Sequence, residues 1–240
     1  MDLYWVRNFG EQTISGNLTL RVPGGKILEV WNPENGARNE AENYEVTPSG
    51  ISVSLKLDPA TAVFLVVKQE GTAAPKFADG PTKSVTVDGP WMVSFQEGRG
   101  APSMVPFEKL TDWSLSEDPG IRYFSGVAEY VTTVSFQAAP EGPCTLQLGS
   151  VKNIAEVTIN DIPCGIAWKT PFEVCIPEGI LRVGDNQLKI KVANLWVNRI
   201  IGDHQPDCQM RYTSTPKPFY SASSPLLPSG LLGPVSIVWE

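Results

Sequence analysis

Residues 155–168 read Ala-Glu-Val-Thr-Ile-Asn-Asp-Ile-Pro-Cys-Gly-Ile-Ala-Trp, and they contain the pattern that recurs along the chain. Ala155, Val157 and Ile159 alternate with polar residues, so their apolar side chains fall on one face of an extended strand. The segment 160–165 predicts a turn, because Asn, Asp, Pro and Gly are the residues that turns prefer. The stretch therefore predicts two short strands joined by a turn.

The same period-two alternation bounds the fold class. Apolar residues take every second position in five further stretches, namely 18–22, 51–57, 91–95, 188–192 and 235–239. Gly and Pro number 21 each, and turn residues at that frequency favour many short strands over long helices. A helical pattern is confined to 107–115, which predicts one or two helical turns, and to 40–44, which predicts a brief turn. The sequence therefore predicts an all-β protein.

Turn residues mark where these strands reverse. Residues 23–25 (Pro-Gly-Gly) predict a hairpin that joins two early strands. Residues 35–36 (Asn-Gly), 88–89 (Asp-Gly) and 184–186 (Gly-Asp-Asn) mark further reversals.

A small and polar stretch predicts the domain boundary. Residues 69–81 contain two prolines and follow the apolar strand 63–67. We therefore expect a first domain over 1–72, a small antiparallel β-sandwich, and a second, larger β domain over 73–240.

The charge balance excludes one class of partner. The net charge is −7 and the sequence pI is about 4.9, whereas a nucleic-acid binder carries a basic patch. No run of about 18 apolar residues occurs, so we expect no membrane span. The first residues lack the pattern of a secretory leader, so we expect a cytoplasmic protein, or a periplasmic or extracellular one if a leader lies outside this stretch.

A series of motifs in the second part carries a family resemblance. Its members are 126–130 (Gly-Val-Ala-Glu-Tyr), 146–149 (Leu-Gln-Leu-Gly), 155–160 (Ala-Glu-Val-Thr-Ile-Asn), Gly165, Trp168, 171–172 (Pro-Phe), 184–188 (Gly-Asp-Asn-Gln-Leu) and 192–194 (Val-Ala-Asn). This order resembles the sugar-binding domain of family 2 glycoside hydrolases. The resemblance implies that residues 73–240 form a galactose-binding-like jelly-roll β-sandwich.

A second resemblance narrows the family. Residues 194–203 read Asn-Leu-Trp-Val-Asn-Arg-Ile-Ile-Gly-Asp, similar to a Trp-x-Asn-Arg-x-x-Gly-Asp signature near the C-terminus of large bacterial α-L-rhamnosidase-like hydrolases. Residues 2–8 and 29–36 resemble the sandwich that follows the catalytic barrel in that family. The resemblance covers nearly the whole chain and implies a C-terminal accessory region.

The chain departs from that family because it has no catalytic barrel, which alone needs about 200 to 250 residues. The resemblance therefore implies a non-catalytic, carbohydrate-associated accessory module that binds glycans weakly, and we expect no catalytic residue. Two alternatives stay open: a structural or interaction module that docks on a catalytic barrel, and a free-standing glycoside hydrolase with an unrecognised site. The partners to expect are a carbohydrate and a catalytic barrel domain or protein.

Candidate sugar-binding residues lie in the recognised segments. A sugar ring packs its C–H face on an aromatic ring, and amide, guanidinium or carboxylate groups bind its hydroxyls. The candidates of these kinds are Trp168, Trp196, Asn198, Arg199 and Asp203. The competing interpretation is that Trp196 packs as a core or interdomain anchor and that Arg199 pairs with Asp203 to fix a loop. In a third interpretation, the segment braces the catalytic barrel.

Other chemistry has weaker support. Glycoside hydrolysis needs two carboxyl groups across a cleft, and the acids beside aromatic or motif residues are Asp112, Glu129, Asp203 and Asp207, which we expect to be solvated or turn-forming. His204 is the only histidine, and Asp203 beside it is poorly placed to complete a catalytic triad. His204 and Cys208 alone do not make a metal site. We expect no cofactor, although the fold resemblance allows a structural calcium ion in a loop such as 116–120.

The remaining tryptophans and the cysteines read as core residues. The tryptophans expected in the core are Trp5, Trp31, Trp91, Trp113 and Trp239. The cysteines, expected to be buried free thiols because each lies in or beside an apolar strand pattern, are Cys144, Cys164, Cys175 and Cys208.

Overall fold

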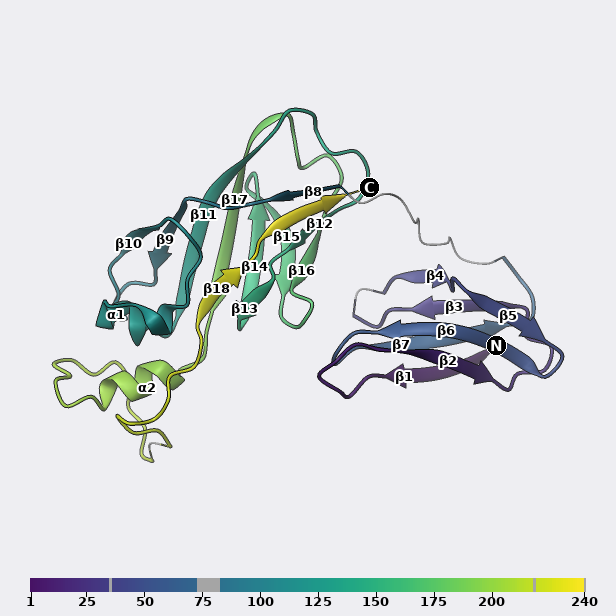
Figure 1. Cartoon of the computed structure of the whole chain (residues 1–240), viewed down its shortest axis with the longest axis horizontal. Coiled ribbons are helices and arrows are strands. Elements are labelled where there is room, and N and C mark those ends of the chain that lie inside the picture. Colours follow the sequence, from purple (N-terminus) through teal and green to yellow (C-terminus); the bar gives the residue numbers. More distant parts are fainter. Residues whose placement is uncertain (35, 73–82, 218, 240) are drawn as a thin grey trace. The chain divides into compact units, whose positions relative to one another are not determined.

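The computed structural model describes residues 1–34, 36–72, 83–217 and 219–239. The chain divides into two compact units, Met1–Gly80 and Pro81–Glu240. The expected boundary between residues 72 and 73 adjoins the segment 73–82, which lies outside the described residues, so its position stays a prediction. The all-β class is confirmed: a small antiparallel sandwich precedes a jelly-roll sandwich, and the described helices are short (Figure 1).

The first unit packs two sheets face to face. One has the strand order β1-β7-β3-β4 and the other β2-β6-β5. Their bounds are β1 (Asp2–Arg7), β2 (Ile14–Leu20), β3 (Ile27–Trp31), β4 (Arg38–Glu40), β5 (Tyr44–Thr47), β6 (Gly50–Leu57) and β7 (Ala62–Lys68). Leu28 and Leu65 from one sheet meet Ile51 and Val53 from the other in the core. This is the burial that period-two alternation predicts for the inner faces of a sandwich.

The hairpin expected at residues 23–25 is wrong, because β2 pairs with β6 whereas β3 pairs with β7 and β4. The Pro-Gly-Gly segment instead carries the chain from one sheet to the other. Gly25 lies so close to Val67 that a Cβ atom would come within 2.6 Å of its Cγ1 atom. Turn residues therefore indicated a reversal correctly but not which strands it would pair.

The second unit is a jelly roll built on two main sheets. The β17 sheet has the order β10-β9-β11-β17-β14-β15, the β12 sheet has the order β16-β12-β19-β8, and β13 pairs with β18 beside them. Their bounds are β8 (Lys83–Thr86), β9 (Trp91–Phe95), β10 (Met104–Phe107), β11 (Val127–Phe136), β12 (Cys144–Gln147), β13 (Ser150–Lys152), β14 (Ile154–Ile159), β15 (Ile162–Ala167), β16 (Glu173–Ile176), β17 (Gly184–Ala193), β18 (Gly230–Gly233) and β19 (Ser236–Trp239).

Aromatic rings fill one end of this second core. Trp113 stacks on Tyr130 with the ring centroids 6.3 Å apart and the planes 9° apart. Phe124 meets the edge of Trp113 at 5.4 Å, and Phe95 meets Phe124 at 4.9 Å. Edge-to-face and offset geometries of this kind add to the burial energy of the rings.

The turn expected at residues 160–165 is shorter than predicted. Only Asn160 and Asp161 form it, both with positive φ (51° and 63°), as in a two-residue type I′ hairpin turn. Strand β15 then starts at Ile162. The Asn160 amide binds Ile180 O at 2.9 Å and the Asn186 side chain at 2.8 Å, which fixes the turn to the next loop.

The expected helix over 107–115 is also reduced. Phe107 ends strand β10, opposite Trp91, and only Trp113–Leu115 form a 3-10 turn (η1). The Asp112 side chain is the N-cap of this turn, because it accepts a hydrogen bond from Ser114 N at 2.9 Å. The other helices are α1 (Pro119–Arg122) and α2 (Val197–Asp203). No helix among the described residues is long and apolar enough to cross a membrane.

Two expected sets of core residues are only partly correct. Trp91 and Trp113 are buried and Trp31 and Trp239 are partly buried, but Trp5 is 61% exposed, because its neighbours in β1 take the inner face. The cysteines are free thiols, as expected, but only Cys144 is buried. Cys175 is exposed because it alternates with two inward residues of β16.

Candidate functional site

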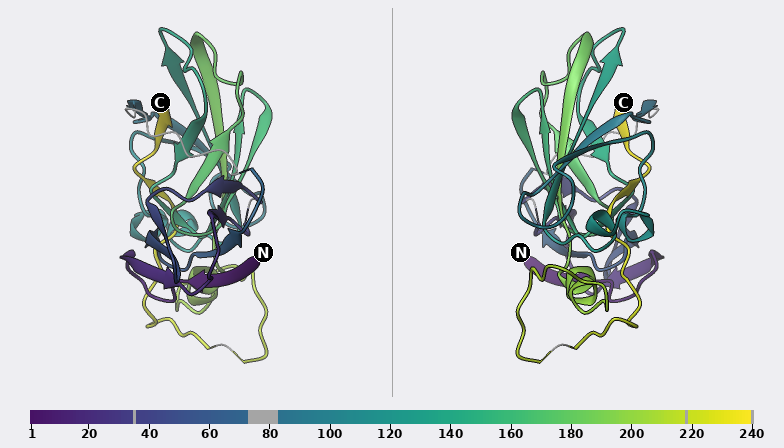
Figure 2. Two further views of the ribbon diagram at one scale, coloured as in Figure 1. Left: turned by 90° about the vertical axis from the view of Figure 1, so that its right-hand side faces the viewer. Right: turned by 90° about the vertical axis from the view of Figure 1, so that its left-hand side faces the viewer.

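Helix α2 and its flanking loops hold most of the residues that the sequence singled out. The helix follows β17 at one end of the second unit, and the long loop after it projects beyond the strands (Figures 1 and 2). Asn198, Arg199 and Asp203 are all buried, which is unusual for side chains of this polarity. Their partners therefore decide what they can do.

Asp203 holds the middle of the loop that follows α2. Its Oδ2 atom accepts from Tyr212 N at 3.0 Å, Thr213 N at 2.7 Å and Thr213 Oγ1 at 2.6 Å. Its Oδ1 atom lies 2.8 Å from Arg199 Nε as an ion pair, although the N–H does not point at the oxygen with hydrogen-bond geometry. The carboxylate is thus committed to the protein itself.

Arg199 is enclosed by aromatic rings. Its guanidinium carbon lies 5.0 Å from the Tyr212 ring centroid and 5.9 Å from that of Tyr123. Its backbone N–H donates to Ser125 Oγ at 3.2 Å. A guanidinium between two rings gains cation–π attraction and ties the loop at Tyr212 to the segment at Tyr123.

Asn198 fixes the far end of the same loop. Its Nδ2 atom donates to Leu227 O at 2.7 Å and to Ser229 Oγ at 3.0 Å, and its Oδ1 atom accepts from Leu227 N at 2.8 Å. The amide therefore has protein partners on both sides. Together with Asp203, it holds a loop of more than 20 residues against α2.

The two tryptophans differ from these residues in being exposed. Trp168 is 60% exposed and Trp196 is 45% exposed, with the Arg99 guanidinium carbon 4.7 Å from the Trp196 ring centroid. Trp168 directly follows Ala167, the last residue of β15. Ala167 pairs with Ala155 of β14, and Ala155 pairs with Val192 near the end of β17. Both indoles therefore belong to the same end of the β17 sheet.

Asp112, Glu129, His204 and Asp118 have partners within the chain, whereas Asp207 is exposed. Asp112 caps η1 and also accepts from Ser229 N at 2.9 Å, and Glu129 lies 4.0 Å from Lys191 on the sheet surface. Nδ1 of His204 contacts Ile200 O at 2.7 Å. In the loop 116–120, Asp118 accepts from Gly120 N at 2.7 Å as the cap of α1. Among the described residues, no group of three His, Cys, Asp or Glu side chains could hold a metal ion.

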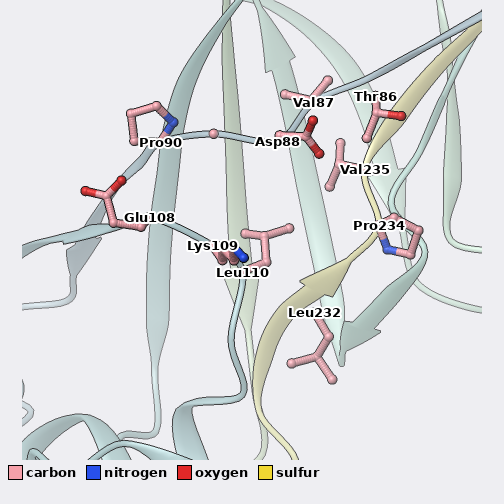
Figure 3. Close-up of a pocket in the computed structure, with 11 residues that line it drawn as sticks. Thr86, Val87, Asp88, Pro90, Glu108, Lys109, Leu110, Leu232, Pro234 and Val235 are labelled. Atoms are coloured by element: carbon pink, nitrogen blue, oxygen red, sulfur yellow. The ribbon is translucent and has the colours of Figure 1, made fainter.

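A groove that the sequence did not predict lies at the open side of the second unit. It is formed where the edge strand β8 of one sheet approaches the segment after β10, the edge strand of the other (Figure 3). Its volume is about 460 Å³. The lining residues are Thr86, Val87, Asp88, Gly89, Pro90, Glu108, Lys109, Leu110, Leu232, Pro234 and Val235. Of these residues, the sequence predicted a structural feature only for the turn at 88–89. The other lining residues come together only through the topology of the sheets.

The comparisons find a similar architecture within larger proteins. The chain is similar to the solved structure of a rhamnosidase from Novosphingobium sp. PP1Y, with a TM-score of 0.87 and 38% identity over 98% of this chain and 22% of that one. It is 31% identical over 250 residues to the protein named "Putative beta-glucuronidase" from Formosa agariphila, which covers 91% of this chain and 20% of the relative. No model of a known family matches the chain.

A more distant likeness concerns the fold alone. A β-glucuronidase from Ruminococcus gnavus superposes with a TM-score of 0.50 and 18% identity over 68% of this chain and 30% of that one. The chain spans about a fifth of the length of the relatives that it matches at higher identity. Over nearly its whole length, the chain is therefore similar to a domain-sized segment of larger glycoside hydrolases.

Proposed function

We propose that this chain is a non-catalytic accessory region of a rhamnosidase-like glycoside hydrolase. The observation that carries the proposal is the match to the Novosphingobium rhamnosidase, which spans 98% of this chain but 22% of that enzyme. A segment of this size, made of two sandwiches, supports an enzyme whose catalytic domain lies elsewhere in the larger protein. The internal use of Asn198, Arg199 and Asp203 agrees with a supporting role, because these groups fix a loop.

The surface that would support the rest of such an enzyme is the end of the second unit around α2. Large apolar side chains are exposed on α2's flanking segments, and Phe219 is 92% exposed. We call this set the α2-end surface; it consists of Leu195, Trp196, Met210, Phe219, Tyr220 and Leu227. Exposed large apolar side chains before a helix and along the anchored loop after it are a feature of contact surfaces. The α2-end surface therefore braces the remainder of the hydrolase.

Weak glycan contact is the second candidate function of the same end. Trp168 and Trp196 are both exposed there, and an exposed indole can pack on the C–H face of a sugar ring. This interpretation uses the two tryptophans without the three buried polar residues. Asn198, Arg199 and Asp203 then act only by holding the loop in place.

An exchange of segments tests the supporting role. This chain replaces the matching segment of the Novosphingobium rhamnosidase, and the melting temperature and rhamnoside turnover of the hybrid are measured with Phe219 intact and with Phe219→Ala. We expect the intact hybrid to be active and the Phe219→Ala hybrid to melt at a lower temperature. The matched control is Val183→Ala, an exposed apolar residue in the loop before β17, which should leave the melting temperature unchanged.

Two outcomes would contradict the proposal. Equal melting temperatures of the Phe219→Ala and Val183→Ala hybrids would show that the α2-end surface does not support the rest of the enzyme. Turnover of aryl glycosides by this chain alone, lost on a single Asp or Glu substitution, would show that the chain is itself a hydrolase.

A further inference from the structure

The groove at the β8 and β10 edges has the size of a small-molecule site. Its volume of about 460 Å³ falls within the range of about 300 to 1,000 Å³ that is common for ligand pockets. It lies between the end of β8 and the segment that follows β10, so that its walls come from segments far apart in sequence. None of the residues that the sequence proposed for sugar contact lines it.

The groove combines a charged rim with an apolar floor. Three exposed charged residues, Asp88, Glu108 and Lys109, line it, and Figure 3 shows Glu108 apart from Asp88 and Lys109 beside Leu110. The floor is apolar, from Leu110, Leu232, Pro234 and Val235. Among the described residues, none of the three charged side chains has a hydrogen bond or an ion pair within the chain. Their polar atoms are therefore available to a ligand.

A buried donor beside the groove has no partner either. Trp91 is 1% exposed, and its indole Nε1 atom makes no hydrogen bond. The pyrrole edge of the indole faces Gly89, which lines the groove: a Cβ atom there would lie 2.6 Å from Cδ1 and 2.9 Å from Nε1. Native proteins leave few buried donors unpaired, so such a group at a groove wall points to a missing polar partner. Because Gly89 has no side chain, the indole edge of Trp91 lies directly behind this part of the groove wall.

The mixture of groups selects among ligand classes. The two carboxylates would repel an anionic ligand. A divalent cation needs several oxygen ligands, and a groove with only two acids and the positive charge of Lys109 disfavours it. A neutral polyol satisfies both kinds of group, because each hydroxyl can donate to a carboxylate and accept from an ammonium group. Its C–H face would lie against the two leucines, Pro234 and Val235 of the floor.

We propose that this groove binds a single residue of a neutral carbohydrate, with Asp88 and Glu108 accepting from its hydroxyls and Lys109 donating to them. The inference rests on the proposed carbohydrate-enzyme context and adds a site to it. This site is separate from the α2-end surface, since the two share no residue. Both acids are exposed, and the groove serves binding rather than hydrolysis.

A titration of the full chain followed by NMR tests the groove. The probes are methyl α-L-rhamnoside and methyl β-D-galactoside at millimolar concentration. We expect shifts of the Asp88, Gly89 and Lys109 amides and of the Trp91 indole N–H. Asp88→Asn and Glu108→Gln keep the side-chain shape, and each should weaken binding about tenfold, the size of a lost hydrogen bond to a charged group. Glu156→Gln, a change at an exposed acid of β14, should leave the affinity unchanged.

The outcomes separate this proposal from the proposed function. Shifts confined to Trp168 and Trp196 would overturn the groove but leave the accessory role intact. An absence of shifts with both neutral probes, or shifts only with glucuronate added as an anionic third probe, would also overturn it, whereas the activity of the hybrid rhamnosidase would be unaffected. Equal affinities of the Glu108→Gln and Glu156→Gln variants would show that the carboxylate does not bind the sugar.

Discussion

The two units differ in how deeply they bury the tryptophans of their strands. In the second unit Trp91 and Trp113 are fully buried around Tyr130, whereas in the first unit Trp5 is 61% exposed. Trp91 lies in a strand whose buried apolar residues take every second position, whereas Trp5 lies in a run of four consecutive apolar residues, Leu3 to Val6. In such a run, the period of a strand tells which residues share a face, but not which face meets the core.

The outer face of the first unit is nonetheless ordered by specific contacts. Trp5, Phe64 and Trp31 lie side by side in register across three strands. Trp31 Nε1 donates to Glu29 Oε2 at 2.8 Å, and Lys68 Nζ lies 2.6 Å from Glu29 Oε1. Rings and charges thus make a second layer on the outer face of that sheet, whereas the second unit buries its rings in the core. The free energy of unfolding should respond very differently to changes in the two layers.

The largest expected effect comes from the tryptophan pair itself. Trp91→Ala should lower the free energy of unfolding of the second unit by about 3 to 5 kcal/mol, because it removes a buried ring and leaves a cavity. Trp5→Ala should cost the first unit less than about 1 kcal/mol, since most of that indole is already in water. Hydrogen exchange read by mass spectrometry, peptide by peptide, measures both units in one experiment.

That comparison has a clear failing outcome. If Trp5→Ala loosened the first unit as much as Trp91→Ala loosens the second, the outer layer would be a core in its own right. Trp239→Ala, a change at a partly buried indole of β19, should give an intermediate loss.

The buried charges give the next largest effect. Asp203→Ala leaves the Arg199 guanidinium buried without its counter-charge and removes three hydrogen bonds to Tyr212 and Thr213. Breaking one side of a buried pair costs about 3 kcal/mol or more. The loop 204–217 should also become a site of cleavage in limited proteolysis. Glu29→Gln in the first unit is the matched change, and its effect should be smaller because Lys68 is partly exposed. A protease-resistant loop in Asp203→Ala would contradict the anchoring role.

The sequence predicts the strands well and their partners poorly. The alternation at 155–159 and 188–192 identifies β14 and β17, because one buried face per strand is a local property. The pairing of β2 with β6 and the crossing at residues 23–25 depend on which sheets stack, and no local pattern records that. The helix propensity of residues 107–115 does not decide their structure. Phe107 instead pairs with Trp91 as the last residue of β10, and tertiary contacts set this pairing.

The candidate sites show the same limit. The signature at 194–203 locates a real polar cluster, yet whether Asn198 and Asp203 face a ligand or a loop depends on where residues 212–227 return. The groove could not be read from the sequence, since Asp88, Glu108 and Pro234 meet only after the jelly roll closes. Sequence patterns therefore give the chemistry available to a site, and topology decides which of it is assembled.

Alkaline pH gives the smallest and most selective effect. Burial raises the pKa of Tyr130 well above its ordinary value of 10.0, and burial together with the hydrogen bond to Glu40 raises the pKa of Tyr44. A raised folded pKa means that the unfolded chain loses its proton first, so stability is complete below pH 10.0 and falls as the pH rises above it. For Tyr130 the free energy of unfolding should fall by about 1.4 kcal/mol per pH unit, and for the more exposed Tyr44 the slope is smaller.

The Tyr130→Phe variant tests this slope. It loses the 3.1 Å hydrogen bond from Leu231 N, which costs about 1 kcal/mol at every pH, but it should flatten the alkaline decline in stability of the second unit. Denaturant unfolding on either side of pH 10 measures the slope, with Tyr44→Phe as its counterpart in the first unit. An unchanged slope in Tyr130→Phe would mean that the dry aromatic core is open to water, and the contrast between the two units would lose its physical basis.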